Sequence, residues 1–255
     1  MRRAAVLRHP VVIWALTLAA VVGAWQLVTE TFGLLNPIIF PSPGTIFDAA
    51  TQALGGTRLW ADALTTATAV FWGVLTGLIA GHVLGMVLGL SSTFRAMWEW
   101  PLAVLNSVPR FALAPLVIIV FGLGTTSKAS LAFVGVSIPV ALLVAVGVRG
   151  VPEVLQQVSS VYGLRGRSKL TKLYLPASLP QLFAGLQIGV TQAVIAVVVA
   201  EMYNPRAGLG RWIALGQANL NPGQIWFASI AVGVAGAMAV FLIRAAGRRV
   251  AHWPA

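Results

Sequence analysis

The sequence predicts an all-α protein that crosses a membrane about six times. Only 9% of the 255 residues are charged and 58% are hydrophobic, with a mean hydropathy of +0.87. Soluble domains carry roughly 25% charged residues, so a water-soluble fold is not expected. Long uncharged runs recur along the chain, and most basic residues stand in the segments between these runs.

The uncharged runs are long enough to form membrane-spanning helices. At about 1.5 Å per residue, roughly 20 residues cross the roughly 30 Å of a hydrocarbon core. The six expected spans lie within residues 10–29, 63–94, 111–127, 129–148, 173–200 and 212–243, with an extension of the third span backwards through 102–108 as the alternative. The first run is longer than the apolar region of a signal peptide and no cleavage site follows it, so we expect a retained span. Residues 31–47 hold Pro37, Pro41 and Pro43 and are expected to form an extracytoplasmic loop.

The distribution of lysine and arginine predicts the orientation, because short cytoplasmic loops retain positive charge. With the amino terminus inside, twelve of the seventeen basic residues are cytoplasmic: Arg2, Arg3, Arg8, Arg95, Arg149, Arg165, Arg167, Lys169, Lys172, Arg244, Arg248 and Arg249. Four lie outside: Arg58, Lys128, Arg206 and Arg211. Both termini are therefore expected in the cytoplasm. The net charge of +11 follows from this topology and does not require a nucleic-acid partner.

Glycines spaced four residues apart predict close packing of the second span. They are Gly73, Gly77, Gly81, Gly85 and Gly89. Small residues at this spacing line one face of a helix and let another backbone approach closely. Gly185, Gly189 and Ala193 repeat the pattern in the fifth span, so we expect a bundle core built around these two helices.

The longest cytoplasmic connection, residues 149–176, predicts a helix, a turn and a second helix outside the membrane. Pro152 and Glu153 suit a helix start, and Gly163 suits a tight turn with positive φ. Such an element is not needed for spanning and indicates docking of a cytosolic partner. The alternative is an ordinary basic loop that follows the positive-inside rule.

Several motifs resemble those of permeases from binding-protein-dependent ABC importers. Gly163, Leu173, Leu175 and Pro176 match the spacing of the family's cytoplasmic signature. Gln157, Val158 and Ser159 stand where that signature has Glu-Ala-Ala, so a carboxylate often used at the ATPase contact is missing. Other segments resemble the nitrate, sulfonate, taurine and bicarbonate branch: Phe40-Pro41-Ser42-Pro43, Ala114-Pro115-Leu116, Phe121-Gly122-Leu123-Gly124 with Ser127-Lys128, and Ala200-Glu201-Met202 before Gly208-Leu209-Gly210.

The resemblance implies a type I importer permease in the bacterial inner membrane. It implies a second permease copy forming a homodimer, two cytosolic ATPase subunits and an extracytoplasmic solute-binding protein. Residues 149–176 would be the coupling segment of a core permease domain at 63–255, preceded by an N-terminal transmembrane helix and extracytoplasmic loop at 1–62. The solute would be small, with an organic anion such as a sulfonate or taurine, or else nitrate, favoured.

The same resemblance implies that this chain is a transport subunit and not an enzyme. ATP and Mg²⁺ would bind to the partner subunit, and the chain itself would bind no cofactor. The sequence agrees, because it has no Gly-x-x-x-x-Gly-Lys-Ser/Thr loop to hold phosphates.

Polar residues within the apolar runs are candidates for the translocation path, because such residues need a partner or water in a membrane. They are Arg110, Gln187, Thr191, Gln192 and Glu201. Arg110 lies near the midplane if the third span begins near Pro101, and at the cytoplasmic interface if it begins at Pro109. For the two glutamines and Thr191, hydrogen bonds between helices are an equal alternative. For Glu201 we favour a salt bridge or a helix cap at the outer end of the fifth span.

Two other classes of function remain to be separated from an ABC permease. A secondary transporter would place an ion-coupling ionisable group at the midplane and often shows inverted repeats, and neither is convincing here. An intramembrane enzyme needs a nucleophile with a base, or a metal site. The chain has no cysteine, and His9, His82 and His252 are scattered, so no such set and no metal site is expected. His82 is expected to serve in packing or hydrogen bonding.

Overall fold

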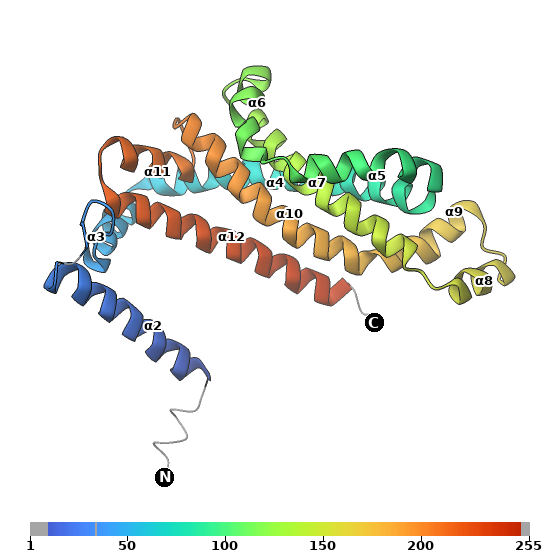
Figure 1. Ribbon diagram of the computed structural model, residues 1–255, viewed down its shortest axis with the longest axis horizontal. Helices are drawn as coiled ribbons and strands as arrows, with labels where there is room; N and C mark the ends of the chain where they lie inside the picture. Colours follow the sequence, from blue (N-terminus) through green and yellow to red (C-terminus); the bar gives the residue numbers. More distant parts are fainter. Residues whose placement is uncertain (1–9, 34, 251–255) are drawn as a thin grey trace, which may run out of the picture. The chain divides into compact units, whose positions relative to one another are not determined.

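The structure, a computed structural model, describes residues 10–33 and 35–250, and all regular structure in these residues is helical (Figure 1). The chain divides into two compact units, Met1–Trp60 with Trp212–Ala231, and Ala61–Arg211 with Val232–Ala255. The helices in chain order are α2 (Pro10–Gln26), the π-helix η1 (Leu27–Thr31), α3 (Pro43–Leu54), α4 (Thr57–Leu90), α5 (Ser92–Ser107), the 3₁₀-helix η2 (Arg110–Leu113), α6 (Ala114–Phe121), α7 (Thr125–Arg149), α8 (Glu153–Val161), α9 (Gly166–Lys169), the π-helix η3 (Leu170–Tyr174), α10 (Leu175–Tyr203), α11 (Leu209–Ala218) and α12 (Pro222–Val250).

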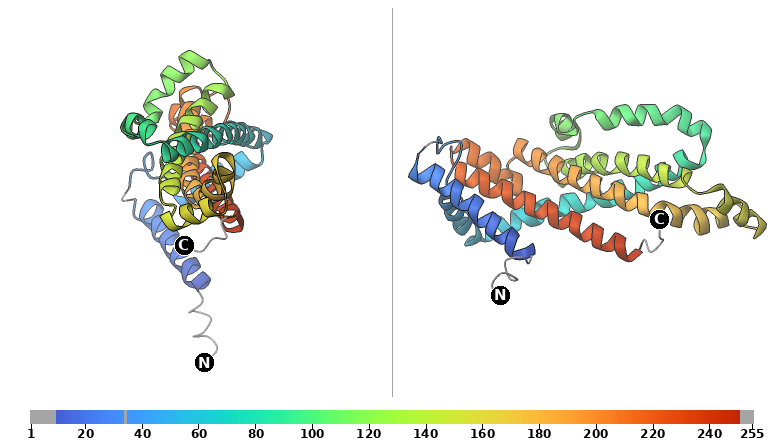
Figure 2. Two further views of the ribbon diagram at one scale, coloured as in Figure 1. Left: turned by 90° about the vertical axis from the view of Figure 1, so that its right-hand side faces the viewer. Right: turned by 60° about the horizontal axis from the view of Figure 1, so that its bottom comes forward.

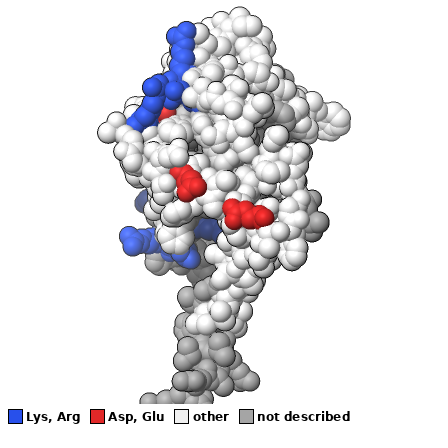
Figure 3. Space-filling view, turned by 90° about the vertical axis from the view of Figure 1, so that its left-hand side faces the viewer, with Lys and Arg blue, Asp and Glu red and all other residues white. Residues whose placement is uncertain are grey.

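Five helical segments of the described residues are long and apolar enough to cross a membrane. They are Val12–Thr31, Thr57–Leu90, Thr125–Arg149, Gly166–Tyr203 and Pro222–Arg249. Large apolar side chains such as Trp14 and Phe241 are exposed on these helices. The face drawn in Figure 3 is mostly free of lysine, arginine, aspartate and glutamate. Exposed apolar side chains such as these are expected where a helix contacts lipid or another membrane helix.

In the first unit, polar and aromatic contacts hold the chain that follows the first span. Ser42 caps α3, because its Oγ accepts a hydrogen bond from the Thr45 N–H at 3.3 Å and Pro43 occupies the first turn. Ser42 Oγ also donates to Glu30 at 2.7 Å. The rings of Trp25 and Trp226 lie 5.1 Å apart. The expected loop at 31–47 is therefore shorter than predicted, since the cap starts a helix at Pro43.

The second unit is built around α7, which packs between α4 and α10. A Cβ added to Gly77 would lie 2.8 Å from Val136 Cβ, and one added to Gly85 would lie 2.7 Å from Val144 Cβ. On its other side, a Cβ on Gly189 would lie 2.9 Å from Val136 Cα. Both glycine faces predicted from the sequence are thus in use, but both pack against α7 and not against each other. Figures 1 and 2 show α7 and α10 side by side along most of their length.

The order of these contacts gives the direction of the helices. Gly73 of α4 packs on Ala132 of α7 and Gly89 packs on Val148, so α4 and α7 are parallel. Gly185 packs on Val140 and Gly189 on Val136, so α10 is antiparallel to α7. Because α4 and α7 run in the same direction, residues 91–124 have to lead from the end of α4 back to the level at which α4 began, where α7 starts.

This return is broken, and the prediction of a continuous third span at 111–127 is wrong. Val108 is extended, with ψ 128°, and Pro109 separates α5 from η2. Gly122, at φ 78°, ends α6 after eight residues, or about 12 Å, too short for a hydrocarbon core. The return is made by two helical pieces, α5 and α6, because prolines and glycines interrupt it.

Replacing Gly81 by leucine is expected to prevent assembly of the α4–α7 pair. An added Cβ would lie 2.5 Å from the Ser137 carbonyl oxygen and 2.9 Å from Val140 Cβ, so the helices must separate to admit it. The yield of monodisperse protein in detergent gel filtration measures the effect. Gly23→Leu is the control, because nothing lies within 4 Å of a Cβ at Gly23. A normal yield of Gly81→Leu, or an equal loss in both variants, would contradict this packing role.

Candidate functional site

A buried cluster of charged and polar groups joins α4, α7 and α10 at one end of the second unit. Glu201 of α10 is fully buried, and its carboxylate lies 3.1 Å from Lys128 Nζ of α7. The carboxylate also accepts hydrogen bonds from Thr66 Oγ1 of α4 at 2.9 Å and from the Gly210 N–H at 3.0 Å. Lys128 Nζ donates to the Ala207 carbonyl at 2.9 Å as well. The salt bridge favoured for Glu201 from the sequence is thus present.

A second ion pair extends this cluster. Asp62 accepts hydrogen bonds from the Gly208 N–H at 2.9 Å and from Arg211 Nη1 at 3.1 Å. The Leu209 N–H donates to Thr66 Oγ1 at 2.8 Å. Three consecutive backbone N–H groups, at 208, 209 and 210, therefore each meet a side chain of α4 or α10. The cluster fixes the backbone of 207–211 to the ends of three helices.

The glycines of this segment are needed for the close approach of Glu201. A Cβ at Gly208, whose φ is 110°, would overlap the Glu201 carboxylate, and one at Gly210 would lie 2.7 Å from Glu201 Cβ. This accounts physically for the motif that joins Glu201 to Gly208 and Gly210. Glu201, a candidate for the translocation path, is enclosed by these partners.

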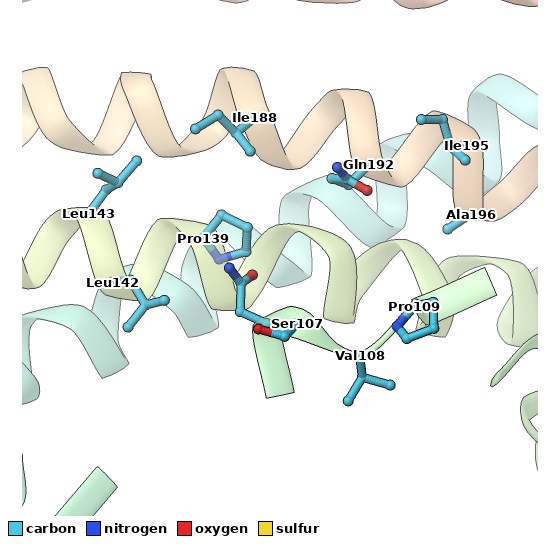
Figure 4. Close-up of a pocket in the computed structure, with 11 residues that line it drawn as sticks. Ser107, Val108, Pro109, Pro139, Leu142, Leu143, Ile188, Gln192, Ile195 and Ala196 are labelled. Atoms are coloured by element: carbon cyan, nitrogen blue, oxygen red, sulfur yellow. The ribbon is translucent and has the colours of Figure 1, made fainter. Parts of the chain in front are cut away.

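A cavity of about 510 Å³ opens where the broken return passes α7 and α10. Its lining comes from three segments: Asn106, Ser107, Val108 and Pro109; Pro139, Leu142 and Leu143; and Ile188, Gln192, Ile195 and Ala196. In Figure 4 the Gln192 side chain projects from α10 toward α7. Of the polar residues singled out in the fifth span, Gln192 is the one that lines this cavity.

The other candidates for the path lie elsewhere or are not described. Gln187 Oε1 accepts a hydrogen bond from Arg244 Nε of α12 at 2.8 Å, so it joins two helices. Thr191 Oγ1 donates to the Gln187 carbonyl of its own helix at 3.1 Å. Arg110 begins η2, and its side chain is outside what the structure describes.

Of the three histidines, His82 is the one that lies among the described residues. His82 is half-buried and its Nδ1 has no hydrogen-bond partner among the described residues. His9 and His252 lie outside those residues. Within residues 10–33 and 35–250 no three His, Cys, Asp or Glu side chains gather where they would hold a metal ion.

The connection between α7 and α10 forms a helix, a turn and a helix at the end of the unit opposite the charged cluster (Figure 1). The helix α8 ends in a Schellman motif, with the Gly163 N–H bonded to the Ser160 carbonyl and the Leu164 N–H to the Ser159 carbonyl. Gly163 has φ 76°, the left-handed conformation expected from the sequence.

One glutamine secures α8 and the next one is exposed on its surface. Gln156 Oε1 accepts from the Tyr174 hydroxyl at 3.2 Å, and its amide group donates to the Val151 carbonyl at 3.0 Å. Gln157 is exposed. An apolar face of α8 is also exposed and comprises Val154, Leu155, Val158 and Val161, with Tyr162 following the helix.

The chain matches the family model of the binding-protein-dependent transport system inner membrane component over residues 73–253. This chain belongs to that family. The match covers the Gly73–Gly89 face, the loop 149–176 and the charged cluster from Lys128 to Arg211.

Similar proteins include the taurine transport system permease protein TauC of Escherichia coli (strain K12), 26% identical over 93% of this chain and 88% of TauC. The riboflavin transport system permease protein RibX of Chloroflexus aurantiacus is 34% identical over 77% of this chain and 73% of RibX. A chain of the MetNI methionine ABC transporter in an inward-facing conformation superposes with a TM-score of 0.63 at 20% identity. The superposition covers 76% of the present chain and 94% of the MetNI chain. The chain is a membrane permease subunit of an ATP-driven ABC importer, with a type I permease fold.

Several residues of the cluster and the cavity were not singled out by the sequence analysis. Asp62 and Thr66 precede the glycine face, and Asn106 and Ser107 precede Pro109. A signal for Asp62 was present, although none marks Thr66: Asp62, Lys128, Glu201 and Arg211 are two acids and two bases at the same expected membrane level. No comparable signal marks Asn106 and Ser107.

Replacing Lys128 by methionine is expected to destabilise the fold by roughly 3–5 kcal/mol, because it leaves the Glu201 carboxylate buried without its cation. Adding Glu201→Gln should recover part of this loss, since an amide oxygen still accepts hydrogen bonds from Thr66 and Gly210. The melting temperature of the purified protein in detergent measures both effects.

The exposed Arg206→Met, in the same segment, serves as the control and should leave the melting temperature unchanged. Purely additive losses from the Lys128 and Glu201 substitutions would show that the two groups do not depend on each other.

Proposed function

We propose that this permease moves a small organic anion, received from an extracytoplasmic binding protein, and that α8 couples it to a cytosolic ATPase. The observation that carries the coupling role is the apolar face of α8. Val154, Leu155, Val158 and Val161 recur at helical spacing and lie exposed outside the five candidate spans. An exposed apolar helix face of this kind fits a groove on a partner protein.

The basic residues support a cytosolic position for this face. Arg165, Arg167, Lys169 and Lys172 follow α8 directly, as the positive-inside rule requires of a cytoplasmic connection. Both termini are then cytoplasmic. In this assembly the permease is a homodimer, ATP and Mg²⁺ bind to two separate ATPase subunits, and this chain catalyses no reaction.

The choice of an organic anion is supported by the relatives. One is named for taurine transport, and the putative aliphatic sulfonates permease SsuC of Bacillus subtilis (strain 168) is 26% identical over 92% of this chain. No acidic residue lines the cavity between α7 and α10 within the described part of the chain, so an anion meets no fixed negative charge there.

Reconstitution of this chain with a candidate ATPase subunit and a candidate solute-binding protein tests the proposal. Proteoliposomes should take up taurine or an alkanesulfonate only when ATP and Mg²⁺ are on the ATPase side. Uptake driven by a proton or sodium gradient without ATP would favour a secondary transporter and refute the proposal.

A negative charge on the apolar face of α8 should uncouple the complex, whereas the same charge beside it should not. Val161, which is 86% exposed, is expected to enter the partner's groove, so Val161→Glu should reduce ATPase association at least tenfold. Gln157→Glu is the matched variant, because it adds the same charge at an exposed polar position. Co-purification of the ATPase measures both, and equal retention in the two variants would argue against docking through this face.

Gly163→Val should misshape the turn without disturbing the spans. The left-handed φ of 76° costs a β-branched residue roughly 1–3 kcal/mol, so the Schellman motif is expected to open. Membrane insertion should be normal, while ATPase association or solute-stimulated ATP hydrolysis falls. Thr171→Val, at an exposed position of η3 whose φ is not in the left-handed region, is the control. Wild-type behaviour of Gly163→Val in both assays would leave the loop as an ordinary basic connection.

A further inference from the structure

The cavity between α7, α10 and residues 106–109 combines polar groups with an apolar wall. Ser107 and Gln192 contribute a hydroxyl and an amide, and Leu142, Leu143 and Ile188 contribute hydrocarbon. Its volume of about 510 Å³ falls within the roughly 300–1,000 Å³ of pockets that bind small molecules. No hydrogen bond joins the Gln192 amide to another residue within 10–33 and 35–250.

The backbone at this cavity is irregular at the depth of the membrane. Pro139 stands near the middle of α7 and Gln192 near the middle of α10. Beside them the return leaves helical geometry at Val108 and Pro109, so the last carbonyls of α5 lack intrahelical partners. Pro139 has no N–H to pair with the carbonyl four residues before it. Within a membrane, such backbone is tolerated where it is buried in protein or lines a water-filled cavity. Because the cavity is open to its surroundings and polar side chains line it, water is the partner that fits.

We propose that this cavity is a solute-binding site of the permease itself, selective for a short organic anion. The oxygens of the anionic head accept hydrogen bonds from the Gln192 amide, and its hydrocarbon part lies against Leu142, Leu143 and Ile188. Neutral donors bind an anion without holding it as strongly as a lysine or arginine would, which suits a site that must release its solute. The apolar wall disfavours an inorganic oxyanion such as nitrate, which has no hydrocarbon to bury.

This inference deepens the proposed function, because it assigns selection to the membrane subunit as well as to the binding protein. It requires neither the ATPase nor α8. It is therefore tested on the full-length permease alone, where a failure of ATP-driven uptake has no effect on the result.

The natural chain has no cysteine, so a single introduced thiol can be labelled without background. Gln192→Cys and Ser107→Cys report on two sides of the cavity. Val190→Cys, which is 2% exposed in the core formed with Val136 and Val140 of α7, is the negative control, and Ser160→Cys on the exposed α8 is the positive control. The probes are two water-soluble methanethiosulfonates of similar size, one carrying a sulfonate and one a quaternary ammonium group, applied to membrane vesicles of both orientations.

We expect the sulfonate reagent to label both cavity positions at least fivefold faster than the ammonium reagent, relative to their rates at Ser160→Cys. Ethanesulfonate should slow labelling in the cavity at least threefold, nitrate at equal concentration should not, and Ser160→Cys should be indifferent to both. Because two positions are tested, the result still stands if one of the two cysteine variants fails to fold.

Absence of labelling at both positions in vesicles of either orientation would show a dry cavity and overturn the proposal. Faster labelling by the ammonium reagent would overturn its preference for anions. Equal protection by nitrate and ethanesulfonate, or none by either, would overturn its selectivity for an organic anion.

Discussion

The close packing of α7 between two glycine faces is the constraint on which the rest of the second unit depends. Valines 136, 140, 144 and 148 of α7 fill the space left by glycines of α4, and the Val136 and Val140 backbone also meets Gly185 and Gly189 of α10. In lipid, apolar side chains gain nothing from leaving water, so this interlocking of shapes is a main source of helix association. Because the contact runs the whole length of α7, it fixes the register and the direction of both neighbours.

The parallel course of α4 and α7 explains why the return between them differs from the other crossings. The returning chain cannot pass between α4 and α7, because these helices are in close contact. It returns beside them in two short helices that are joined at Val108 and Pro109. The irregular backbone is thereby placed beside the middle of α7 and α10, where it forms one wall of the cavity. Packing and the candidate solute site thus have the same origin.

Much of this architecture could be predicted from the sequence, because each membrane span requires a long run of uncharged, apolar residues. The helical class, the glycine faces and the Gly163 turn follow from hydropathy, spacing and the conformational freedom of glycine. The partner of the glycines could not be predicted in this way, although Val136, Val140, Val144 and Val148 share their spacing. The prediction of the third span failed for a local reason. Residues 111–127 are apolar enough for a membrane-spanning helix, but Pro109 and Gly122 break the helical backbone on either side of η2 and α6. Thr66 could not be predicted because its hydrogen bonds join distant segments that meet only in the folded chain, whereas matching charges at one expected membrane level could have indicated Asp62.

The backbone contacts of α4, α7 and α10 also limit how the permease can move. Three helices locked at their glycines lack the loose side-chain layer that would let them slide, so we expect them to turn as one rigid body. The segment from α8 to η3 is continuous with two of these helices, at Arg149 and Leu175. Under the proposed docking at α8, a force on α8 would therefore be passed to this rigid body, and the charged cluster at its opposite end would move with it. We expect the hinges of such a motion at residues 108–109 and 122–124, where the chain leaves helical geometry before η2 and after α6.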